Sequence, residues 1–375
     1  MPRGPLPPIV CFSNLDWGYL RYRKQHLMER LARYTDVLYV DPPRSMKWRQ
    51  PRRWGVVTQV APRLRVLEPI VLPGMKRHPS LKDLTYRLIA RRIRALVPDG
   101  PAPILWIYSP HAWRFVELLS SGTVVYDMAD DYSVPTGRVL RGPDEAAELQ
   151  LLDTLERRML ARADVVFCVS ELLREKAVAR GVANARVLAN GCDFDAYPDE
   201  LPPPAHPDRP VVGYVGTVVP RTDVELIREL ARLRPDWDVE IVGPISPLVS
   251  IPPDGPSNLR WVGEIPYAEV PARIARFDAG ILPLREIDYA YKSSPIQVFD
   301  YLAAGKPVVS SPVAQFEQWP AVISTARGAR AFADALSRLL ADDSREHQRT
   351  RREFARQNSW DARVAEAVAA LLRRP

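Results

Sequence analysis

The sequence of 375 residues predicts an α/β protein with two Rossmann-like domains that face a cleft. Short apolar runs alternate with longer stretches of helical periodicity on both sides of the middle of the chain, which is typical of parallel, doubly wound sheets. A proline-rich stretch, DELPPPAHPDRP at residues 199–210, separates the two alternating halves. The chain length and an apolar content of 46% are sufficient for two hydrophobic cores.

In the first half, apolar runs and amphipathic stretches follow one another with few interruptions. The predicted strands are residues 8–13, 37–43, 104–110, 123–132, 164–170 and 185–191. The predicted helices are residues 22–33, 81–96, 145–163 and 171–180. Because each strand is followed by a crossover stretch, we expect one mainly parallel sheet.

The second half begins with a strand, a glycine turn, a helix, a strand and another glycine over residues 211–245. The helix at residues 223–233 carries its apolar side chains on one face. The run AGILPL at residues 279–284 is predicted to be a buried strand, and residues 360–372 are predicted to be a final helix.

These patterns define the expected domains. Residues 1–198 form an N-terminal Rossmann-like domain, residues 199–210 a linker, and residues 211–357 a C-terminal Rossmann-like domain. A C-terminal helix follows at about residues 358–375.

Positive charge is concentrated near the start of the chain. Residues 1–100 hold 20 Lys and Arg against 7 Asp and Glu, so the remaining residues carry a net charge of −6 within the total of +7. The surplus lies mainly at residues 44–55 and 76–94, where Trp48, Trp54 and Tyr86 alternate with cations. Basic residues with interfacial aromatics favour an anionic membrane surface, with a plain solvated surface as the alternative. We find no nucleic-acid-binding motif and expect no nucleic-acid partner.

The sequence predicts a cytoplasmic protein that is peripheral at the inner face of the plasma membrane. No apolar run approaches the roughly 20 residues of a spanning helix, and the first residues lack a signal-peptide layout. The three cysteines, Cys11, Cys168 and Cys192, are far apart and lie in apolar runs, so we expect them to be reduced core residues.

The most informative segment is YAYKSSPIQVFDYLAAGKPVVS, residues 289–310. Pro295 suits the first turn of a helix that ends at Gly305. The free N–H groups at such a helix start attract a diphosphate, and an acid further along the helix accepts hydrogen bonds from a ribose. The predicted donor-binding residues in this segment are Lys292, Ser293, Ser294, Pro295, Ile296 and Asp300.

The glycine turn near residue 216 supports the same function. Gly213 and Gly216 allow the backbone to approach a ligand closely, and Thr217 and Arg221 follow in the same loop. We therefore add Gly216, Thr217 and Arg221 to the predicted donor site.

These two segments resemble the donor domain of the retaining GT-B glycosyltransferases known as glycosyl transferases group 1. The resemblance implies that residues 211–357 bind the nucleotide sugar, that residues 1–198 bind the acceptor, and that the helix at about residues 358–375 crosses back onto the first domain. It also implies that Arg221 contacts the diphosphate, because many relatives carry a diphosphate-binding Lys or Arg near this position.

The family motif has two glutamates separated by seven residues; here Asp300 replaces the second, and Lys292 stands near the place of the first. The proline-led form at Pro295 is similar to a branch that acts in bacterial surface-polysaccharide assembly. Because the first acid contacts the donor sugar in the family, its absence leaves the sugar and the stereochemical outcome open.

In the first domain, three loops at strand ends are expected to line the cleft. The loop after residue 13 holds the predicted acceptor-binding residues Asp16, Trp17, Gly18, Arg23 and His26. His111 follows another strand and resembles the donor-contacting histidine of the family.

The third loop, in YDMADDY, holds Asp127, Asp130 and Asp131. With His111 they are the predicted catalytic residues. Asp130 or Asp131 would accept the proton of an attacking hydroxyl in an inverting enzyme or orient the acceptor, whereas a retaining enzyme needs no separate base. The alternative for Asp130 and Asp131 is to cap the following turn.

We expect neither a metal nor any other cofactor. The spacings Asp193/Asp195 and Asp236/Asp238 imitate a metal-binding motif, but the first lies before the linker and the second in a turn before a strand. In the GT-B plan cationic side chains stabilise the departing diphosphate.

The expected activity is transfer of a hexosyl group from a nucleotide-diphosphate sugar to a lipid-linked or polysaccharide acceptor in bacterial surface glycan synthesis. The alternatives are a GT-B nucleotide-sugar epimerase and a catalytically silent scaffold of a glycan-synthesis complex. The sequence leaves the donor sugar, its base, the acceptor and the oligomeric state open.

Overall fold

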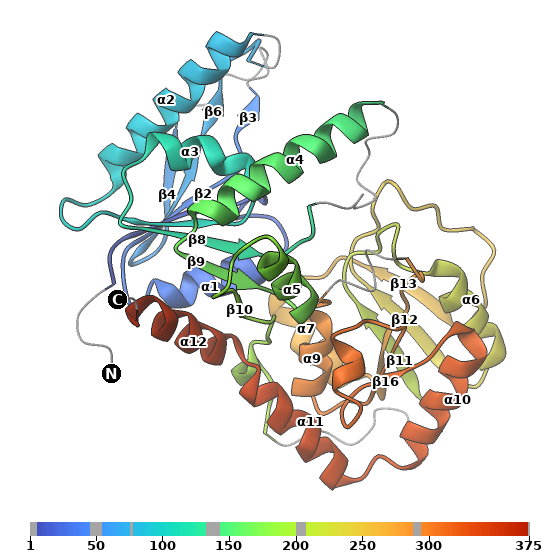
Figure 1. Ribbon diagram of the computed structural model, residues 1–375. Helices are drawn as coiled ribbons and strands as arrows, with labels where there is room; N and C mark the ends of the chain where they lie inside the picture. Colours follow the sequence, from blue (N-terminus) through green and yellow to red (C-terminus); the bar gives the residue numbers. More distant parts are fainter. Residues whose placement is uncertain are drawn as a thin grey trace. The chain divides into compact units, whose positions relative to one another are not determined.

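The computed structural model describes residues 6–45, 55–75, 78–132, 143–199, 208–287 and 294–373. These residues form two compact units, coloured mainly blue to green and yellow to red in Figure 1. Unit 1 contains the described residues up to 188 and residues 364–373, and unit 2 contains residues 189–363. Residues 189–198, which we assigned to the first domain from the sequence, thus cluster with unit 2.

Unit 1 is built on an eight-stranded sheet in the order β10-β9-β8-β7-β1-β2-β5-β4. Only β4 runs antiparallel to its neighbour, and the other pairs are parallel. The strands are β1 (Ile9–Phe12), β2 (Val37–Val40), β4 (Val56–Ala61), β5 (Leu64–Glu68), β7 (Ile104–Ile107), β8 (Thr123–Met128), β9 (Val165–Cys168) and β10 (Arg186–Val187). A separate parallel pair joins β3 (Arg44–Ser45) to β6 (Ile70–Val71).

Four helices of unit 1 cover one face of this sheet and contribute to a single apolar core. They are α2 (Pro79–Leu96), α3 (Trp113–Leu118), α4 (Pro143–Arg162) and α5 (Glu171–Ala179). The helix α1 (Arg23–Leu31) covers the opposite face, where Arg23 reaches Asp127 of β8. The predicted parallel α/β sheet of the first half is confirmed. The antiparallel β4 was not predicted, because its solvent-facing side lacks a clear apolar pattern.

Unit 2 has a six-stranded, fully parallel sheet in the order β13-β12-β11-β14-β15-β16. The strands are β11 (Val211–Val215), β12 (Asp238–Val242), β13 (Leu259–Gly263), β14 (Ala279–Leu282), β15 (Val308–Ser310) and β16 (Ser324–Thr325). Since all strands are parallel, the loops after their carboxyl ends meet along one edge of the sheet.

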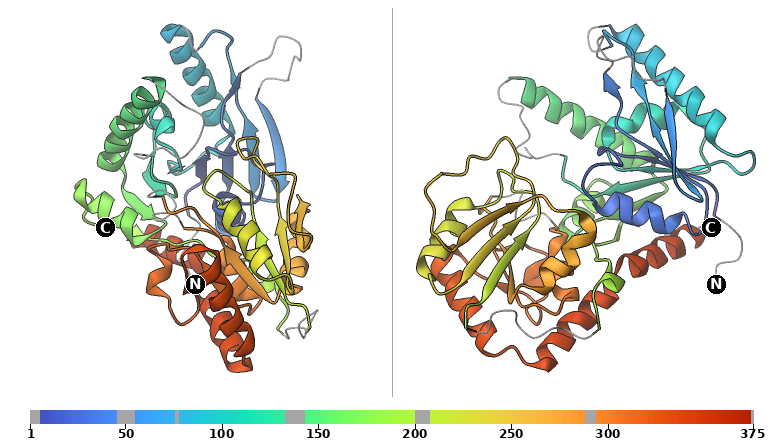
Figure 2. Two further views of the ribbon diagram at one scale, coloured as in Figure 1. Left: turned by 90° about the vertical axis from the view of Figure 1, so that its right-hand side faces the viewer. Right: turned by 180° about the vertical axis from the view of Figure 1, so that it is seen from behind.

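Helices pack on both faces of the unit 2 sheet, as the views in Figure 2 make visible. The helices with residues in unit 2 are α6 (Val224–Leu233), α7 (Val270–Ala275), α9 (Gln297–Ala303), α10 (Gly328–Ala341), α11 (Arg345–Gln357) and the start of α12 (Trp360–Leu372). Of these, α7, α10 and α11 were not predicted individually. The predicted bounds of the final helix, residues 360–372, coincide with those of α12.

Segment 189–198 belongs to unit 2 because backbone bonds tie it to the chain before α12. The Cys192 N–H donates to the Asn358 carbonyl over 3.3 Å, and the Trp360 N–H donates to the Cys192 carbonyl over 2.9 Å. A Cβ at Gly191 would overlap the Asn358 carbonyl, so only glycine permits this approach.

Candidate active site

The helix α9 begins later than the sequence predicted. We expected Pro295 in its first turn, but the helix starts at Gln297 with Ile296 at its N-cap. The carbonyl oxygen of Ser294 accepts a hydrogen bond of 2.7 Å from the Asn190 side chain, which fixes this residue outside the helix. With only seven residues, α9 has a small dipole, so less of the diphosphate charge can be balanced by the helix than the sequence suggested.

The loop after β11 lies directly against the start of α9. Gly216 has a φ of 146°, which side chains other than glycine avoid. A Cβ at this position would stand 3.1 Å from Nε2 of Gln297. The predicted donor residues Gly216, Thr217 and Ile296 are therefore close neighbours in unit 2. The sequence analysis did not include Gln297. Its neighbour Gly216 is far away in the sequence, so no local sequence pattern marks this contact.

Asp300 lies one turn into α9 and is half-buried. Its carboxylate accepts a hydrogen bond from the hydroxyl of Tyr197. The pKa of Asp300 is raised to about 7, chiefly by burial; the hydrogen bond from Tyr197 lowers it, and the neighbouring Asp193 carboxylate raises it. The predicted ribose-binding acid thus belongs to a small polar cluster whose other members come from residues 189–198.

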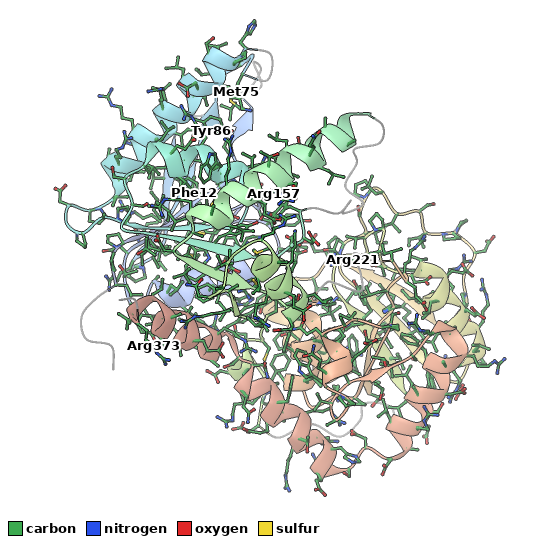
Figure 3. The ribbon with its side chains drawn as sticks, in the orientation of Figure 1. Phe12, Met75, Tyr86, Arg157, Arg221 and Arg373 are labelled. Atoms are coloured by element: carbon green, nitrogen blue, oxygen red, sulfur yellow. The ribbon has the colours of Figure 1, made fainter. Side chains whose placement is uncertain are left out.

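Loops from three strands form a connected layer beside Gly216. Val218 bridges Ile245 after β12, and Thr222 bridges Leu284 after β14. The Arg285 N–H donates to the Arg221 carbonyl over 2.8 Å. Arg221, labelled in Figure 3, therefore extends from a braced loop of unit 2, and Arg285 is a second cation beside it that the sequence analysis missed. Lys292 and Ser293, both predicted to bind the donor, lie outside the described residues.

The structure corrects the interpretation of Asp127 and Arg23. Asp127 is fully buried on β8 and receives the guanidinium of Arg23, with Nε–Oδ1 and Nε–Oδ2 distances of 3.1 Å. The indole N–H of Trp106 donates to the same carboxylate over 3.3 Å. These contacts give Asp127 and Arg23 a structural role between α1 and the sheet, in place of the predicted catalytic and acceptor-binding roles.

Asp131 is also held in a buried network. Its Oδ1 lies 2.6 Å from Nζ of Lys176 on α5, and the same ammonium lies 2.7 Å from Oε2 of Glu156 on α4. Arg180 reaches Glu156 as well, over 2.5 Å. Because Asp131 is buried and paired with a cation, it is a poor candidate for the proton acceptor.

Asp130 and His111 are more accessible. Asp130 is half-buried in the bend after β8. His111 is exposed in a short 3₁₀ turn (Pro110–Ala112), with Nε2 3.2 Å from Oε1 of Glu148. Of the four predicted catalytic residues, these two are the ones that unit 1 leaves at its surface.

The loop after β1 combines accessible and engaged residues. Asp16 and Trp17 are half-buried, and the Trp17 N–H donates to Oδ1 of Asp41 over 2.8 Å. Gly18 is exposed, and a Cβ added to it would meet no atom within 4 Å, so no described part of the chain requires a glycine at this position.

His26 is buried, with 2% of its surface exposed. Burial, followed by the charges of Arg21 and Arg30, lowers the pKa of His26 to about 3, so the imidazole is neutral at physiological pH. Its predicted acceptor-binding role is not supported by this placement.

The part of the chain that the structure describes contains no group of three or more His, Cys, Asp or Glu residues arranged to hold a metal ion. Within the same described residues there is no helix that is both long and apolar enough to cross a bilayer. All three cysteines are buried and unpaired with one another.

Two parallel α/β units, with glycine loops and an acid-bearing helix at the strand ends of the second, define the GT-B class of glycosyltransferases. Sequence comparison assigns residues 23–191 to a glycosyl transferase 4-like domain and residues 209–342 to the family described as glycosyl transferases group 1. The two matches lie in different parts of the chain, one mainly in each unit, and both describe glycosyltransferases.

The similar proteins agree with this assignment. A putative teichuronic acid biosynthesis glycosyltransferase, TuaH of Bacillus subtilis, is 27% identical over 386 aligned positions that cover 94% of each chain. A sucrose-phosphate synthase from Thermosynechococcus elongatus has a TM-score of 0.72 at 18% identity, covering 97% of this chain and 98% of its own. HepE from Anabaena, solved with UDP and glucose, has a TM-score of 0.68 at 13% identity, covering 98% and 99%. The two structures support the fold alone.

Proposed function

We propose that this glycosyltransferase moves a sugar from a nucleoside-diphosphate donor to a lipid-linked or polysaccharide acceptor in bacterial surface glycan synthesis. The relative that carries the name of teichuronic acid biosynthesis covers nearly the whole chain and supports the pathway class. HepE, which shares the fold at 13% identity, was solved with UDP and glucose, and a nucleotide-sugar donor is compatible with that complex.

The observation that carries the proposal is that the start of α9, the helix that holds Asp300, lies against the Gly216 loop, in the unit whose sequence matches glycosyl transferases group 1. In this proposal the Gly216 backbone and Arg221 face the diphosphate together with Lys292, and the carboxylate of Asp300 accepts the ribose hydroxyls.

The substitution Asp300→Ala tests this assignment. Loss of hydrogen bonds to a charged group is expected to raise the donor dissociation constant at least about tenfold in calorimetry. Asp195→Ala is a suitable control, because Asp195 is an exposed acid in the same unit. Unchanged donor affinity in a folded Asp300→Ala protein would contradict the role of Asp300.

We propose that the reaction needs no metal ion, because cationic side chains can balance the departing diphosphate. Initial rates should then be the same in EDTA and in Mg²⁺. A rate that is lost in EDTA and returns with Mg²⁺ would contradict this part of the proposal.

In unit 1, we propose that Asp130 contacts the acceptor, together with Asp16 and Trp17, and that His111 contacts the donor. Asp130→Asn is expected to lower kcat by about a hundredfold if the carboxylate takes the acceptor proton. A change confined to the acceptor KM would instead indicate that Asp130 orients the acceptor. Determining the product anomer by NMR decides between the inverting and the retaining reaction.

We also propose that α2 rests on an anionic membrane. Leu84 and Leu88 lie at the centre of its solvent-facing side and are 46% and 40% exposed. Exposed arginines flank them at Arg87, Arg91 and Arg92. In interfacial helices, exposed leucines typically enter the headgroup region of the membrane, and the arginines beside them contact anionic lipids.

The structure changes which residues of the predicted basic surface face outward. Tyr86, which the sequence analysis included, is half-buried and packs edge-on against Phe115 at 5.1 Å between ring centroids. Trp48 and Trp54 lie outside the described residues.

Vesicle cosedimentation tests the α2 surface. We expect binding to vesicles with anionic lipid, weak binding to neutral ones, and loss of binding in Leu84→Glu/Leu88→Glu. Val178→Glu on α5 is a matched control, since Val178 is also 40% exposed. Equal binding by the control and the double variant to both vesicle types would refute the proposal.

A further inference from the structure

Two buried tyrosines hold the loop that follows β11. The Val215 N–H donates to the hydroxyl oxygen of Tyr301 over 2.7 Å. The hydroxyl of Tyr214 donates to the Thr217 carbonyl over 3.1 Å. Both rings are buried, Tyr301 on α9 and Tyr214 on β11, so the two ends of a three-residue segment are fixed from inside the unit.

The middle of this segment is held through its backbone alone, by a hydrogen bond of 2.9 Å from the Gly216 N–H to the Val242 carbonyl. Gly216 has no side chain, and its φ of 146° is accessible mainly to glycine. On one side the loop meets Gln297 and the Tyr214 hydroxyl, where a Cβ would lie at 3.1 and 3.2 Å. On the other side the Gly216 carbonyl lies against Gly243, which has no room for a Cβ. The position of the backbone therefore depends on its neighbours.

Tyr301 is itself firmly placed. Its ring lies on the Cα of Gly280 in β14, where a Cβ would overlap it. At the end of α9, Arg351 donates to the Gly305 carbonyl and Arg352 to the Ala303 carbonyl, each over 2.8 Å. These bonds satisfy carbonyl groups that a helix end leaves free. The Tyr301 hydroxyl thus connects a helix of fixed position to the Gly216 loop.

We propose that Tyr301 is a positioning residue for the donor, with Tyr214 as its second support. By holding the Val215 N–H, the Tyr301 hydroxyl keeps the Gly216 backbone in register with α9, so that the loop and Asp300 meet the same bound nucleotide. Tyr301 itself is buried and does not touch the donor. This inference rests on the proposed function.

The substitution Tyr301→Phe keeps the ring and removes only the hydroxyl. Calorimetry with UDP, GDP, dTDP and ADP first identifies the nucleotide that the unmodified protein binds most tightly. For that nucleotide we expect Tyr301→Phe to raise the dissociation constant about tenfold, because the Val215 N–H loses its partner and the loop its register. In the transfer assay the donor KM should rise more than kcat falls, and the acceptor KM should be unchanged.

Tyr126→Phe is the matched control. Tyr126 is also fully buried, and its hydroxyl donates to Oε1 of Glu156 over 3.1 Å, but it lies in unit 1. The same chemical change there should lower the melting temperature and leave the nucleotide dissociation constant as it is. Tyr214→Phe is expected to weaken nucleotide binding about threefold and serves in place of Tyr301→Phe if that variant does not fold.

The possible outcomes distinguish failure of the positioning role of Tyr301 from failure of the proposed function. Nucleotide affinity in Tyr301→Phe equal to that of the unmodified protein would overturn the positioning role while leaving the proposed function intact. An equal loss of affinity in Tyr301→Phe and Tyr126→Phe would also overturn it, since the effect would then reflect general destabilisation. Failure of the unmodified protein to bind any of the four nucleotides would contradict the proposed function itself.

Discussion

The loops at the strand ends of the two units are held by different kinds of contact. In unit 2 the loops beside the proposed donor site are made of backbone and glycine, with Gly216 and Gly243 in contact and a tyrosine on either side. In unit 1 the corresponding edge is held by side-chain charges, with Arg23 on Asp127 and Lys176 on Asp131. The comparison suggests that shape limits substitution in unit 2, and charge pairing limits it in unit 1.

The substitution Gly243→Ala should have the largest effect. Its φ of 133° is unfavourable for alanine, and the added Cβ would overlap the Gly216 carbonyl. We expect a loss of about 3 kcal/mol or more in the free energy of unfolding, measured by urea denaturation, together with weaker donor binding. Gly255→Ala is the control, because its Cβ would meet no atom within 4 Å. If both variants are equally stable, the close contact of the two glycines does not matter.

The substitution Asp127→Asn tests unit 1 in the same way. It leaves the Arg23 guanidinium buried opposite a neutral amide, so we expect a loss of about 3 kcal/mol in the free energy of unfolding. Calorimetric affinity for the nucleotide should be unchanged, since the donor site is proposed in unit 2. A stable Asp127→Asn protein would show that the pair adds little.

An effect of intermediate size is expected from Asp300→Asn, and it should depend on pH. The pKa of Asp300 is raised from 3.8 to about 7, chiefly by burial, so the folded chain binds a proton that the unfolded chain releases between about pH 4 and pH 7. The stability of the unmodified protein therefore falls as pH rises through this window, and Asn does not titrate.

The stability advantage of Asp300→Asn over the unmodified protein should grow by about 1 to 2 kcal/mol between pH 5 and pH 8, after allowance for solvent at the half-buried carboxyl. Urea denaturation at the two pH values measures it. An advantage that does not change with pH would mean that Asp300 titrates near its ordinary value.

The smallest effect is expected from Arg157→Ala. Arg157, labelled in Figure 3, pairs with Asp153 one turn away on the exposed side of α4, at 2.8 Å. Because water screens such pairs, the free energy of unfolding should change by less than about 0.5 kcal/mol. A loss as large as that of Asp127→Asn would remove the distinction between buried and exposed pairs in unit 1.

Features that depend on local sequence patterns could be predicted, and features that depend on contacts between distant residues could not. The two mainly parallel sheets follow from local alternation and were predicted in outline, without β4. The donor segments around Gly216 and Asp300 are contiguous motifs, so the sequence could single them out, and their role in donor binding stays a prediction. The bounds of α12 were predicted because its apolar periodicity and its start at Trp360 are local. The later start of α9 was not, because it depends on Asn190, which is 104 residues away from Ser294.

Long-range charge pairing was beyond prediction for the same reason. Arg23 and Asp127 are 104 residues apart, and Asp131 and Lys176 are 45 apart, so each appeared as an isolated polar residue in a loop. Isolated acids at strand ends suggest catalysis until their partners are known. The hydrogen bonds of Tyr197 and Tyr301 were missed likewise, since a buried tyrosine has no sequence pattern of its own.

The arginines that cap α9 matter for the design of an isolated donor-binding fragment. The segment that matches glycosyl transferases group 1 ends at residue 342, whereas Arg351 and Arg352 lie beyond it on α11. A recombinant piece cut at that border would leave the last carbonyl groups of α9 without their guanidinium donors, and Tyr301 on a fraying helix. We expect such a piece to need residues up to at least 357 before it can be crystallised or labelled for NMR in a ligand-competent state.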